Sequence, residues 1–412
     1  MTELREKINN IVEEKNTKII SENIKAGVQV FDITGSYTSD ANATAEDIAK
    51  DKTAYVNGEK IIGTKEESSG SNITKGLIIN KCNENGYPID ISIVGMTEIP
   101  NKYLYVYDTG DGNKTWIQYC TTISLPSGLT KIGNYAFTDC EKLALTELPE
   151  GITSIGTHAF LSCDSLALTK LPSQLTTLGN YAFSNCTKLA LTELPSGLTS
   201  MGQYTFNNCY ELAITEIPEG ITKIENNCFY NCKVMPLTKL PSGLTSIGNN
   251  AFYTCSELAL TEIPDTVKTI GSEAFRYCAK LNITKLPDSL TSIGNNAFYQ
   301  CAKISITEIP EGVTVLPSYG FSSCTGITEI TIKGVLKTIS TYAFRGCSNL
   351  QKVVMPNITS VPTLGGTNAF ASTPIESKTG YIYVPDSLVD SFKTATNWST
   401  YADQIKGVSE LV

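Results

Sequence analysis

Histidine is almost missing from this sequence, since His158 is the only one among 412 residues. Histidine is the side chain that most often moves protons near neutral pH, and it is a frequent metal ligand. Sites built on two or more histidines are therefore excluded. The carboxylates are scattered and the glycines fall at turns, so neither a glycosidase pair nor a phosphate-binding loop is present. We predict no catalytic residue, no metal site and no cofactor, and we expect the chain not to be an enzyme.

Basic charge and long apolar runs are also scarce. Lys and Arg number 32 against 41 Asp and Glu, which gives a formal net charge of −9 at pH 7. Nucleic acids and anionic membrane surfaces are bound by basic faces, so neither partner is expected. Residues 1–20 contain no apolar stretch long enough for a signal peptide or a transmembrane helix. We therefore expect folding in a cytoplasm and no secretion through a signal peptide.

Cysteine, by contrast, is plentiful and regularly spaced. Ten of the 13 cysteines recur every 23 residues. Many cysteines in a small secreted protein suggest disulfides, but this chain is long and its thiols are periodic. A fixed period of this length indicates a stacked repeat architecture. The periodic cysteines are Cys140, Cys163, Cys186, Cys209, Cys232, Cys255, Cys278, Cys301, Cys324 and Cys347.

Phenylalanine follows the same period, as does an apolar residue placed directly before proline. Ten phenylalanines from Phe137 to Phe344 each stand three residues before a periodic cysteine. Pro241 and Gly243 illustrate the turn residues that separate the apolar positions. A single 23-residue coil cannot enclose a core, but each coil covers the next. The sequence predicts a mostly β solenoid of 23-residue repeats, capped at both ends, with an N-terminal helix and a small β module.

The cysteine column is predicted to serve packing. A small, weakly polar side chain beside Phe252 fits a tight inner corner of the coil. Paired strands lie roughly 4.8 Å apart, so neighbouring cysteines would come within disulfide range. Their Cβ atoms would nevertheless point in parallel rather than toward one another. We expect an unbridged ladder of thiols, with disulfides or metal ligation as the alternatives.

Charges of mostly alternating sign occupy a second column, just before the apolar-proline step. Opposite charges that face each other across neighbouring strands contribute about 0.2–1 kcal/mol each and oppose slips of register. We expect this column to support register and solubility. It consists of Glu147, Lys170, Glu193, Glu216, Lys239, Glu262, Lys285 and Glu308.

Tyrosines gather near the phenylalanine and cysteine of five consecutive repeats. An aromatic ring with a hydroxyl group suits contacts to a sugar or a protein surface, although tyrosine is also tolerated at an exposed turn. His158 occupies a position that carries Tyr135 or Tyr181 in other repeats, and is predicted to be a surface substituent. We hypothesise that the tyrosines bind a ligand. The row consists of Tyr210, Tyr230, Tyr253, Tyr277 and Tyr299.

Smaller units are predicted on either side of the repeats. An amphipathic helix over residues 1–20 carries Leu4, Ile8, Ile11 and Val12 on one face. That face would serve attachment and self-association, with a trimer as one option, or would pack on the chain itself. The other predicted units are a small β module at 21–66 with an Asn57-Gly58 hairpin turn, a linker at 67–74, a solenoid cap at 75–124 with strands Leu77 to Lys81 and Ile89 to Val94, repeats at 125–377 and a second cap at 378–412.

The second cap is predicted to begin with a strand and to continue as a helix from about Ser387. Asp386 would be the N-cap residue of that helix. Trp398 and Tyr401 are available to cover the last coil.

The unit LPSGLTSIGNNAFYTCSEL resembles the BspA-type leucine-rich repeat. In that family Ile-Gly, Ala-Phe, Cys and Leu hold the positions of Ile247-Gly248, Ala251-Phe252, Cys255 and Leu258. The resemblance covers about Lys75 to Val412 and implies a leucine-rich-repeat solenoid. Such solenoids present a long ordered face that suits binding.

The stretches EKNTKIISENIKAGVQVFDITGSY and ATAEDIAKDKTAYVNGEKIIGT resemble modules at the front of tail-fibre and other virion appendage proteins. Those proteins belong to phages and prophages of Gram-positive gut bacteria, and the resemblance covers about Thr2 to Glu66. It implies a phage or prophage tail-fibre-like receptor-binding protein, assembled in the host cytoplasm and located in the virion.

In that interpretation the N-terminal part binds the virion tail or other virion proteins and forms a homo-oligomer. The solenoid binds a bacterial cell-surface polysaccharide or protein. Two alternatives remain open, namely a structural virion decoration or spacer protein and a bacterial surface adhesin.

Overall fold

Each coil of the computed structural model is organised around side chains that are entirely shielded from solvent. The structure describes residues 53–56, 59–62, 76–83, 88–101 and 119–411. Leu244, Ala251, Phe252 and Leu258 of one coil are all 0% exposed. Ile247 and Cys255 of the same coil are buried as well, whereas most of the other residues between Leu244 and Leu258 are polar and at least partly exposed. Since the same positions are apolar in nearly every repeat, each coil buries its apolar side chains against its neighbours.

The chain is a mostly β parallel solenoid of about 12 turns with a 23-residue spacing, which confirms the predicted fold class. It divides into two compact units, Met1–Leu175 with Asn185–Thr187, and Thr176–Ser184 with Lys188–Val412.

In the first unit, an antiparallel hairpin leads into parallel rungs. β1 and β2 pair as a hairpin, while the predicted Asn57-Gly58 turn lies outside the described residues. The two strands predicted at Leu77 to Lys81 and Ile89 to Val94 are β3 and β4, which pair antiparallel, and β4 then pairs in parallel with β6. The strands are β1 (Thr53–Val56), β2 (Glu59–Ile62), β3 (Gly76–Cys82), β4 (Pro88–Val94), β5 (Glu98–Ile99), β6 (Thr122–Ser124), β7 (Lys131–Ile132) and β8 (Ser154–Ile155).

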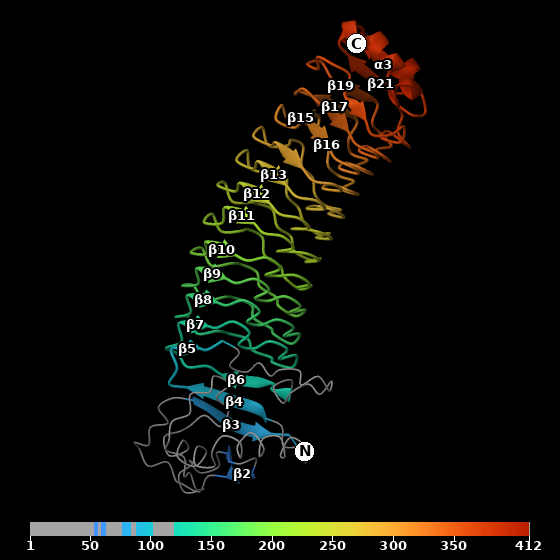
Figure 1. Cartoon of the computed structure of the whole chain (residues 1–412). Helices are drawn as coiled ribbons and strands as arrows, with labels where there is room; N and C mark the ends of the chain where they lie inside the picture. The colour runs from blue at the N-terminus through green and yellow to red at the C-terminus, as the bar shows by residue number, and fades with distance from the viewer. Residues whose placement is uncertain (1–52, 57–58, 63–75, 84–87, 102–118, 412) are drawn as a thin grey trace, which may run out of the picture. The chain divides into compact units, whose positions relative to one another are not determined.

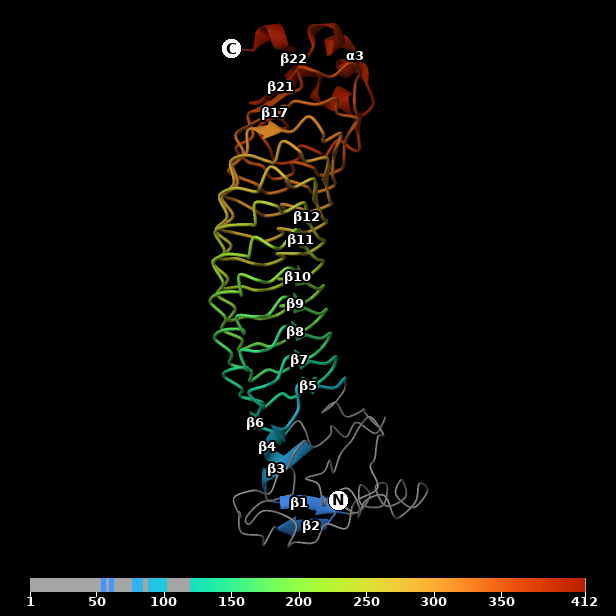
Figure 2. The same ribbon diagram turned by 90° about the vertical axis from the view of Figure 1, so that its left-hand side faces the viewer.

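In the second unit, short strands pair in parallel with the equivalent strand of the next coil (Figures 1 and 2). One column joins β11 to β14, and another joins β15, β17, β19, β21 and β22. The strands are β9 (Thr177–Leu178), β10 (Ser200–Met201), β11 (Lys223–Ile224), β12 (Ser246–Ile247), β13 (Thr269–Ile270), β14 (Ser292–Ile293), β15 (Glu308–Ile309), β16 (Val315–Leu316), β17 (Glu329–Ile332), β18 (Thr338–Ile339), β19 (Lys352–Val354), β20 (Thr363–Leu364), β21 (Tyr381–Val384) and β22 (Ile405–Gly407).

The phenylalanine column runs through the second unit as a continuous stack of rings. Phe229 and Phe252 lie with ring centroids 5.5 Å apart, and Phe252 and Phe275 5.4 Å apart, with interplanar angles of 6° and 7°. The stack continues to Phe370 near the C-terminus. Offset stacking of this kind stabilises aromatic pairs beyond the area that they bury.

Two residues of each coil adopt the left-handed backbone conformation, two positions before and two positions after the phenylalanine. In one coil these are Asn250 with φ 54° and Thr254 with φ 58°. Asparagine tolerates this region better than other residues with a side chain, because its short polar group bonds locally. Tyrosine is uncommon there.

Close backbone contact between coils requires glycine at Gly248. A Cβ atom at this position would lie 2.7 Å from the backbone N of Asn226, whereas a Cβ at Gly243 would meet nothing within 4 Å. We expect Gly248→Ala to lower the free energy of unfolding by about 1–3 kcal/mol, the range of overpacking. Gly243→Ala, the matched control in the same coil, should be neutral or stabilise by up to about 1 kcal/mol. Urea unfolding of both variants measures this, and equal stabilities would contradict the stacking geometry.

The alternating charge column lies on the surface, but its lysines do not pair within the column. Lys170 Nζ lies 3.3 Å from Glu150 Oε1, and Lys239 Nζ lies 3.2 Å from Glu219 Oε1. The turn explains this correction, since the Glu219 carboxylate is fixed beside the lysine by accepting a hydrogen bond from the Ser242 backbone N at 2.7 Å.

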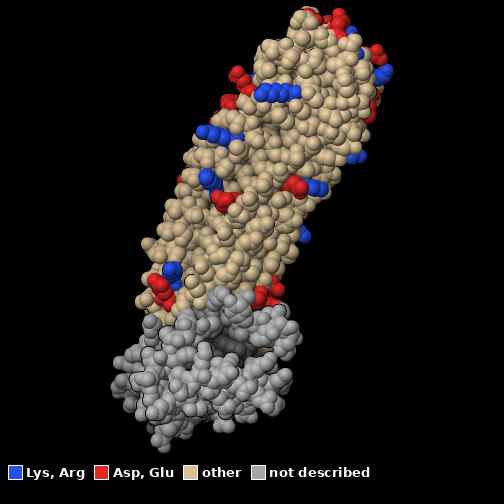
Figure 3. Space-filling model, in the orientation of Figure 1, with Lys and Arg blue, Asp and Glu red and all other residues tan. Residues whose placement is uncertain are grey.

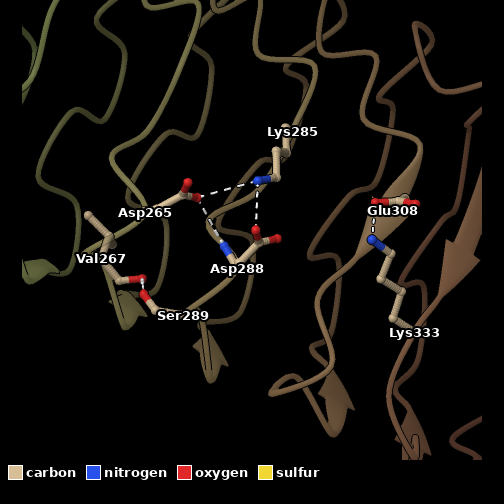
Figure 4. A network of polar contacts seen from close by, with 7 residues as sticks. All are labelled: Asp265, Val267, Lys285, Asp288, Ser289, Glu308 and Lys333. Carbon is tan, nitrogen blue, oxygen red and sulfur yellow. Dashed lines mark hydrogen bonds and ion pairs between the residues drawn. The ribbon is translucent and has the colours of Figure 1, made fainter.

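The same arrangement recurs in the coil of Lys285. Its Nζ lies 3.6 Å from Asp265 Oδ1 and 2.8 Å from Asp288 Oδ2, and Lys333 pairs nearby with Glu308 (Figure 4). Charged side chains are sparse on the face seen in Figure 3, and several lie beside one of opposite sign. Exposed ion pairs contribute about 0–1 kcal/mol, so these pairs add little to stability.

The C-terminal cap covers the last coil with two buried aromatic residues, as predicted. Trp398 and Tyr401 are each 1% exposed, and Trp398 Nε1 donates a hydrogen bond to the Pro362 carbonyl at 2.7 Å. The helical segments are η4 (Asp386–Leu388), α3 (Val389–Thr394), η5 (Trp398–Gln404) and η6 (Val408–Glu410).

The predicted N-cap role of Asp386 is wrong. Pro385 precedes the first helical turn, and no side chain caps it. β22 pairs with β21 and carries the chain back, so that Ser409 donates its hydroxyl to Asp386 Oδ1 at 2.7 Å. A local sequence rule could not foresee this contact, because it joins residues of different turns.

Candidate ligand-binding surface

The periodic cysteines belong to the core rather than to a site. All ten are buried and free of disulfides. From Cys163 to Cys347, each Sγ donates a hydrogen bond to the carbonyl of the phenylalanine in the preceding coil, for example from Cys255 to Phe229 at 3.0 Å. Burial raises the pKa of seven of these thiols, to about 12 for Cys301 and Cys347; the seven are Cys140, Cys232, Cys255, Cys278, Cys301, Cys324 and Cys347. A reactive cysteine needs a lowered pKa, so this column is structural.

The sulfur contacts explain why cysteine fills the position. Alanine would fill the tight inner corner of the coil as well as cysteine does, so packing alone does not explain the choice of cysteine. The phenylalanine carbonyl, however, has a second acceptor position beyond the one used within its own coil, and only a small side chain with a donor reaches it. Cysteine supplies that donor.

The structure brings four of the five tyrosines of the predicted row together. Tyr230 and Tyr253 are stacked with centroids 4.7 Å apart, and Tyr277 meets Tyr253 and Tyr299 edge to face at 5.6 and 5.7 Å. Tyr210 follows its cysteine instead of preceding it, and its ring lies under the ammonium group of Lys233 at 5.2 Å. These four rings connect consecutive coils.

Two further tyrosines, missed in the sequence, continue the series. Tyr319 lies 6.2 Å from Tyr299 and is stacked on Tyr342 at 4.6 Å. Both stand two residues before their phenylalanine, on the other side of the column from Tyr299. Alignment of the repeats on their phenylalanines places Tyr319 and Tyr342 at the same position of neighbouring coils, and this was visible in the sequence. We name the set Tyr230, Tyr253, Tyr277, Tyr299, Tyr319 and Tyr342 the tyrosine strip.

Arg276 lies at the centre of the tyrosine strip. Its guanidinium carbon is 5.7 Å from the ring centroid of Tyr253, 4.8 Å from that of Tyr277 and 4.9 Å from that of Tyr299. Cations over aromatic faces at such distances are attracted by the ring quadrupole. Arg276 also donates to Glu273 Oε2 and to the Tyr277 hydroxyl, both at 3.0 Å. One side chain thus connects three coils.

The surroundings of Arg276 and Tyr230 each favour one protonation state. Desolvation alone would lower the pKa of Arg276, but hydrogen bonds to Tyr277 and Glu273 outweigh it and raise that pKa. Desolvation also raises the pKa of Tyr230. The guanidinium is therefore charged and the phenol of Tyr230 is neutral at physiological pH.

Several positions in the tyrosine strip carry an unfavourable backbone conformation. Tyr277, Tyr319 and Tyr342 have φ angles of 65°, 56° and 61°. Tyr135, Tyr181 and Tyr204 adopt the same conformation outside the strip, and other coils place residues such as asparagine, serine or glycine at these positions. The conformation is therefore a property of the repeat and does not distinguish the strip.

His158, the single histidine, is half-buried and stacks on Tyr135 with centroids 4.6 Å apart. Burial lowers its pKa, so it is neutral at physiological pH. Across the described ranges 53–56, 59–62, 76–83, 88–101 and 119–411, no group of three or more His, Cys, Asp or Glu is arranged to hold a metal ion. No helix among those residues is long and apolar enough to span a membrane.

Parallel coils of 23 residues with a buried phenylalanine stack form a leucine-rich-repeat solenoid, a scaffold that is typically not enzymatic. The chain belongs to the BspA type leucine rich repeat family, whose model matches residues 116–236 and 238–376 in six copies. No curated protein matches the chain.

Several solved structures are similar to it. A leucine-rich repeat protein from Bacteroides ovatus is 22% identical over 71% of this chain and 84% of its own, with a TM-score of 0.48. A leucine rich cell surface protein from Faecalibacterium prausnitzii is 21% identical over 83% and 99%, with a TM-score of 0.38. The pneumococcal vaccine antigen PcpA is 18% identical over 87% and 86%, with a TM-score of 0.42.

The comparisons do not support the resemblance of Thr2 to Glu66 to tail-fibre modules, because the family match begins at residue 116. The predicted attachment residues Leu4, Ile8, Ile11 and Val12 lie outside the described residues. The roles of these residues and the boundaries of the smaller units stay predictions.

Proposed function

We propose that this chain is a surface-binding protein of the adhesin type, and that the tyrosine strip holds its ligand. The observation that carries the proposal is the contact series from Tyr230 to Tyr342, centred on Arg276. Tyrosine and arginine are the residues most enriched among those that dominate binding energies. The adhesin alternative of the sequence is preferred here to the tail fibre, since the family match covers the solenoid and not the N-terminal part.

Rigidity supports a binding role for the strip. Each ring is held by a neighbouring ring or by a guanidinium, so little side-chain freedom remains to be lost when a ligand binds.

Binding to cell surfaces tests the proposal. The full chain, carrying a fluorescent label, is titrated onto intact bacterial cells and cultured epithelial cells, and its affinity is compared with that of a strip variant. The variant carries Tyr253→Ser, Tyr277→Asn and Tyr299→Ser, residues that other coils hold at the same positions in Ser184, Asn231 and Ser322. Loss of three central contacts is expected to weaken binding at least about tenfold.

The matched control removes two stacked tyrosines that do not belong to the strip. Tyr181 and Tyr204 lie 4.4 Å apart in the same unit, and both stand where other coils carry asparagine. The double variant Tyr181→Asn/Tyr204→Asn should bind like the original chain. Unchanged binding of the strip variant, or binding to no surface at all, would reject the proposal.

A further inference from the structure

The charges at the centre of the tyrosine strip, around Arg276, compensate each other. In the four coils from Asn226 to Gln300, the segments around the phenylalanine read NNCFYN, NNAFYT, SEAFRY and NNAFYQ, with Glu273 and Arg276 as their only charged residues. The two are joined at 3.0 Å, and their side chains are 31% and 26% exposed. The cluster is therefore neutral overall while offering both strong acceptors and strong donors.

Each of these groups keeps capacity for a ligand. Arginine has five N–H donors, and the two hydrogen bonds to Glu273 and Tyr277 use one on each terminal nitrogen. The hydroxyls of Tyr277 and Tyr299 accept hydrogen bonds from Arg276 and Gln300, at 3.0 and 3.3 Å, which leaves their own O–H groups to donate. A ligand that combines donors and acceptors matches this pattern.

An anionic ligand fits the cluster poorly. It would have to displace the Glu273 carboxylate or lie beside it, and like charges repel strongly in a partly desolvated site. A cationic ligand would meet Arg276 in the same way. Hydroxyl groups, which donate and accept without charge, meet neither obstacle.

The length of the strip favours a polymer. Six consecutive coils contribute one ring each, and coils paired through parallel strands rise by roughly 4.8 Å, so the strip extends over about 24 Å. Among the described residues, the large hydrophobic side chains that are most exposed are Tyr210, Val234, Val315, Val335 and Leu411, and none belongs to the strip. The strip is therefore not a contiguous exposed apolar patch of the kind that marks a protein–protein contact.

We propose that the tyrosine strip binds an extended, uncharged polysaccharide, and that Arg276 and Glu273 hydrogen-bond its hydroxyl groups at the centre. This inference rests on the proposed function and names the chemical class of its ligand. The ring edges and phenolic hydroxyls contact successive sugar residues along the strip. The faces of Tyr230 and Tyr253 that meet each other are occupied, so hydrogen bonding rather than ring stacking selects the sugar.

Affinity measurements on defined polysaccharides test this inference. The full chain is titrated with soluble neutral polymers (mannan, galactan, xylan, β-glucan) and anionic polymers (polygalacturonate, hyaluronan). Binding to at least one neutral polymer is expected, with an affinity that changes less than about twofold between roughly 0.05 and 0.5 M salt, because no net charge is screened. Binding to anionic polymers alone, with affinity that falls as salt rises, would overturn the inference.

Glu273→Asn gives the sharpest discrimination, since Asn250 and Asn296 hold the same position in neighbouring coils. Replacing the charged carboxylate acceptor with a shorter, neutral amide should weaken binding of a neutral polysaccharide about tenfold. For an anionic ligand the same variant would remove a repulsion and strengthen binding, which would overturn the inference.

Arg276→Ser is expected to weaken binding by a similar factor, because it removes the guanidinium donors at the centre of the strip. Ser184 and Ser322 hold the same position in other coils, so the coil accepts serine there. Arg345→Ser is the charge-matched control. Arg345 occupies the equivalent position and contacts Tyr342 alone among the strip rings, at 5.2 Å. It should change affinity less than about twofold. Equal losses for the two arginine variants would reject a central role for Arg276.

The failure of this inference can be told apart from failure of the proposed function. Mild periodate oxidation of the target cells destroys vicinal diols, whereas protease treatment removes proteins. Binding that is lost with periodate and survives protease supports the polysaccharide. Strip-dependent binding that survives periodate and is lost with protease would overturn this inference and leave the proposed function intact.

Discussion

Raising the pH from about 8 to about 10 is expected to lower the free energy of unfolding steeply, because the buried thiols stay protonated while those of the unfolded chain ionise. Burial raises the pKa of Cys120, Cys301 and Cys347 to about 12 each, and raises that of Cys255 further. An exposed thiol ionises near about 8.5. The folded state therefore holds more protons than the unfolded state between these values.

The sign follows directly from proton binding. Where the unfolded state binds fewer protons, stability falls as pH rises, by about 1.4 kcal/mol per pH unit for each fully affected thiol. Several thiols of neighbouring coils unfold together, so their contributions add within one cooperative unit. The stabilising contribution is complete below about pH 8 and is lost progressively above it.

Urea unfolding at several pH values between about 8 and about 10 measures this dependence, and comparison with a variant that lacks two thiols separates their effect from that of lysine and tyrosine. The ultraviolet absorbance of thiolate should stay low in the folded chain and rise on unfolding. The control variant Cys255→Ala/Cys278→Ala should show a shallower pH dependence, since two thiols are missing. A stability that is constant through this range would contradict the burial of the cysteine column.

Removing the indole of the C-terminal cap is expected to have the second large effect. Trp398 is 1% exposed, packs edge to face on Phe392 at 4.8 Å, and donates to the Pro362 carbonyl. Replacing a buried large aromatic side chain with alanine costs about 3–5 kcal/mol through lost transfer energy and the cavity left behind. Trp398→Ala should therefore destabilise the coils beside β21 and β22.

Hydrogen exchange resolves where that loss appears. Amides of β19, β21 and β22 should exchange faster in Trp398→Ala, while those of β11 to β13 keep their protection, since coils interact mainly with their neighbours. Tyr401→Phe is the control, because it removes only the hydroxyl that donates to the Thr367 carbonyl. It should cost about 0.5–1.5 kcal/mol. Uniform deprotection of both regions by Trp398→Ala would contradict this local view of the cap.

The periodicity of Phe252 and Cys255 was enough to predict the coil, its stacking and the burial of both columns. Periodic spacing encodes which residues recur on the same layer. It does not encode the direction of a donor, and so the contact from Cys255 to the Phe229 carbonyl could not be predicted. That contact depends on the orientation of a peptide group in another coil.

The tyrosine row shows the same limit. Its five members were grouped by their nearness to phenylalanine and cysteine, although Tyr210 follows the cysteine and turns toward Lys233. Tyr319 lies on the far side of the phenylalanine, yet it reaches Tyr299. Contacts between residues of different columns depend on the backbone conformation, including that of the left-handed residues. The spacing of residues along the sequence carries no information on that conformation.

The sulfur-to-carbonyl bond has an evolutionary consequence. Each coil from Cys163 onward receives its acceptor from the coil before it and offers an equivalent one to the coil after it. Whole coils are consequently interchangeable, and unequal recombination between repeats can lengthen or shorten the array without leaving any thiol or carbonyl unmatched. A gain or loss of one residue has no such freedom, since it would shift every later donor away from its acceptor.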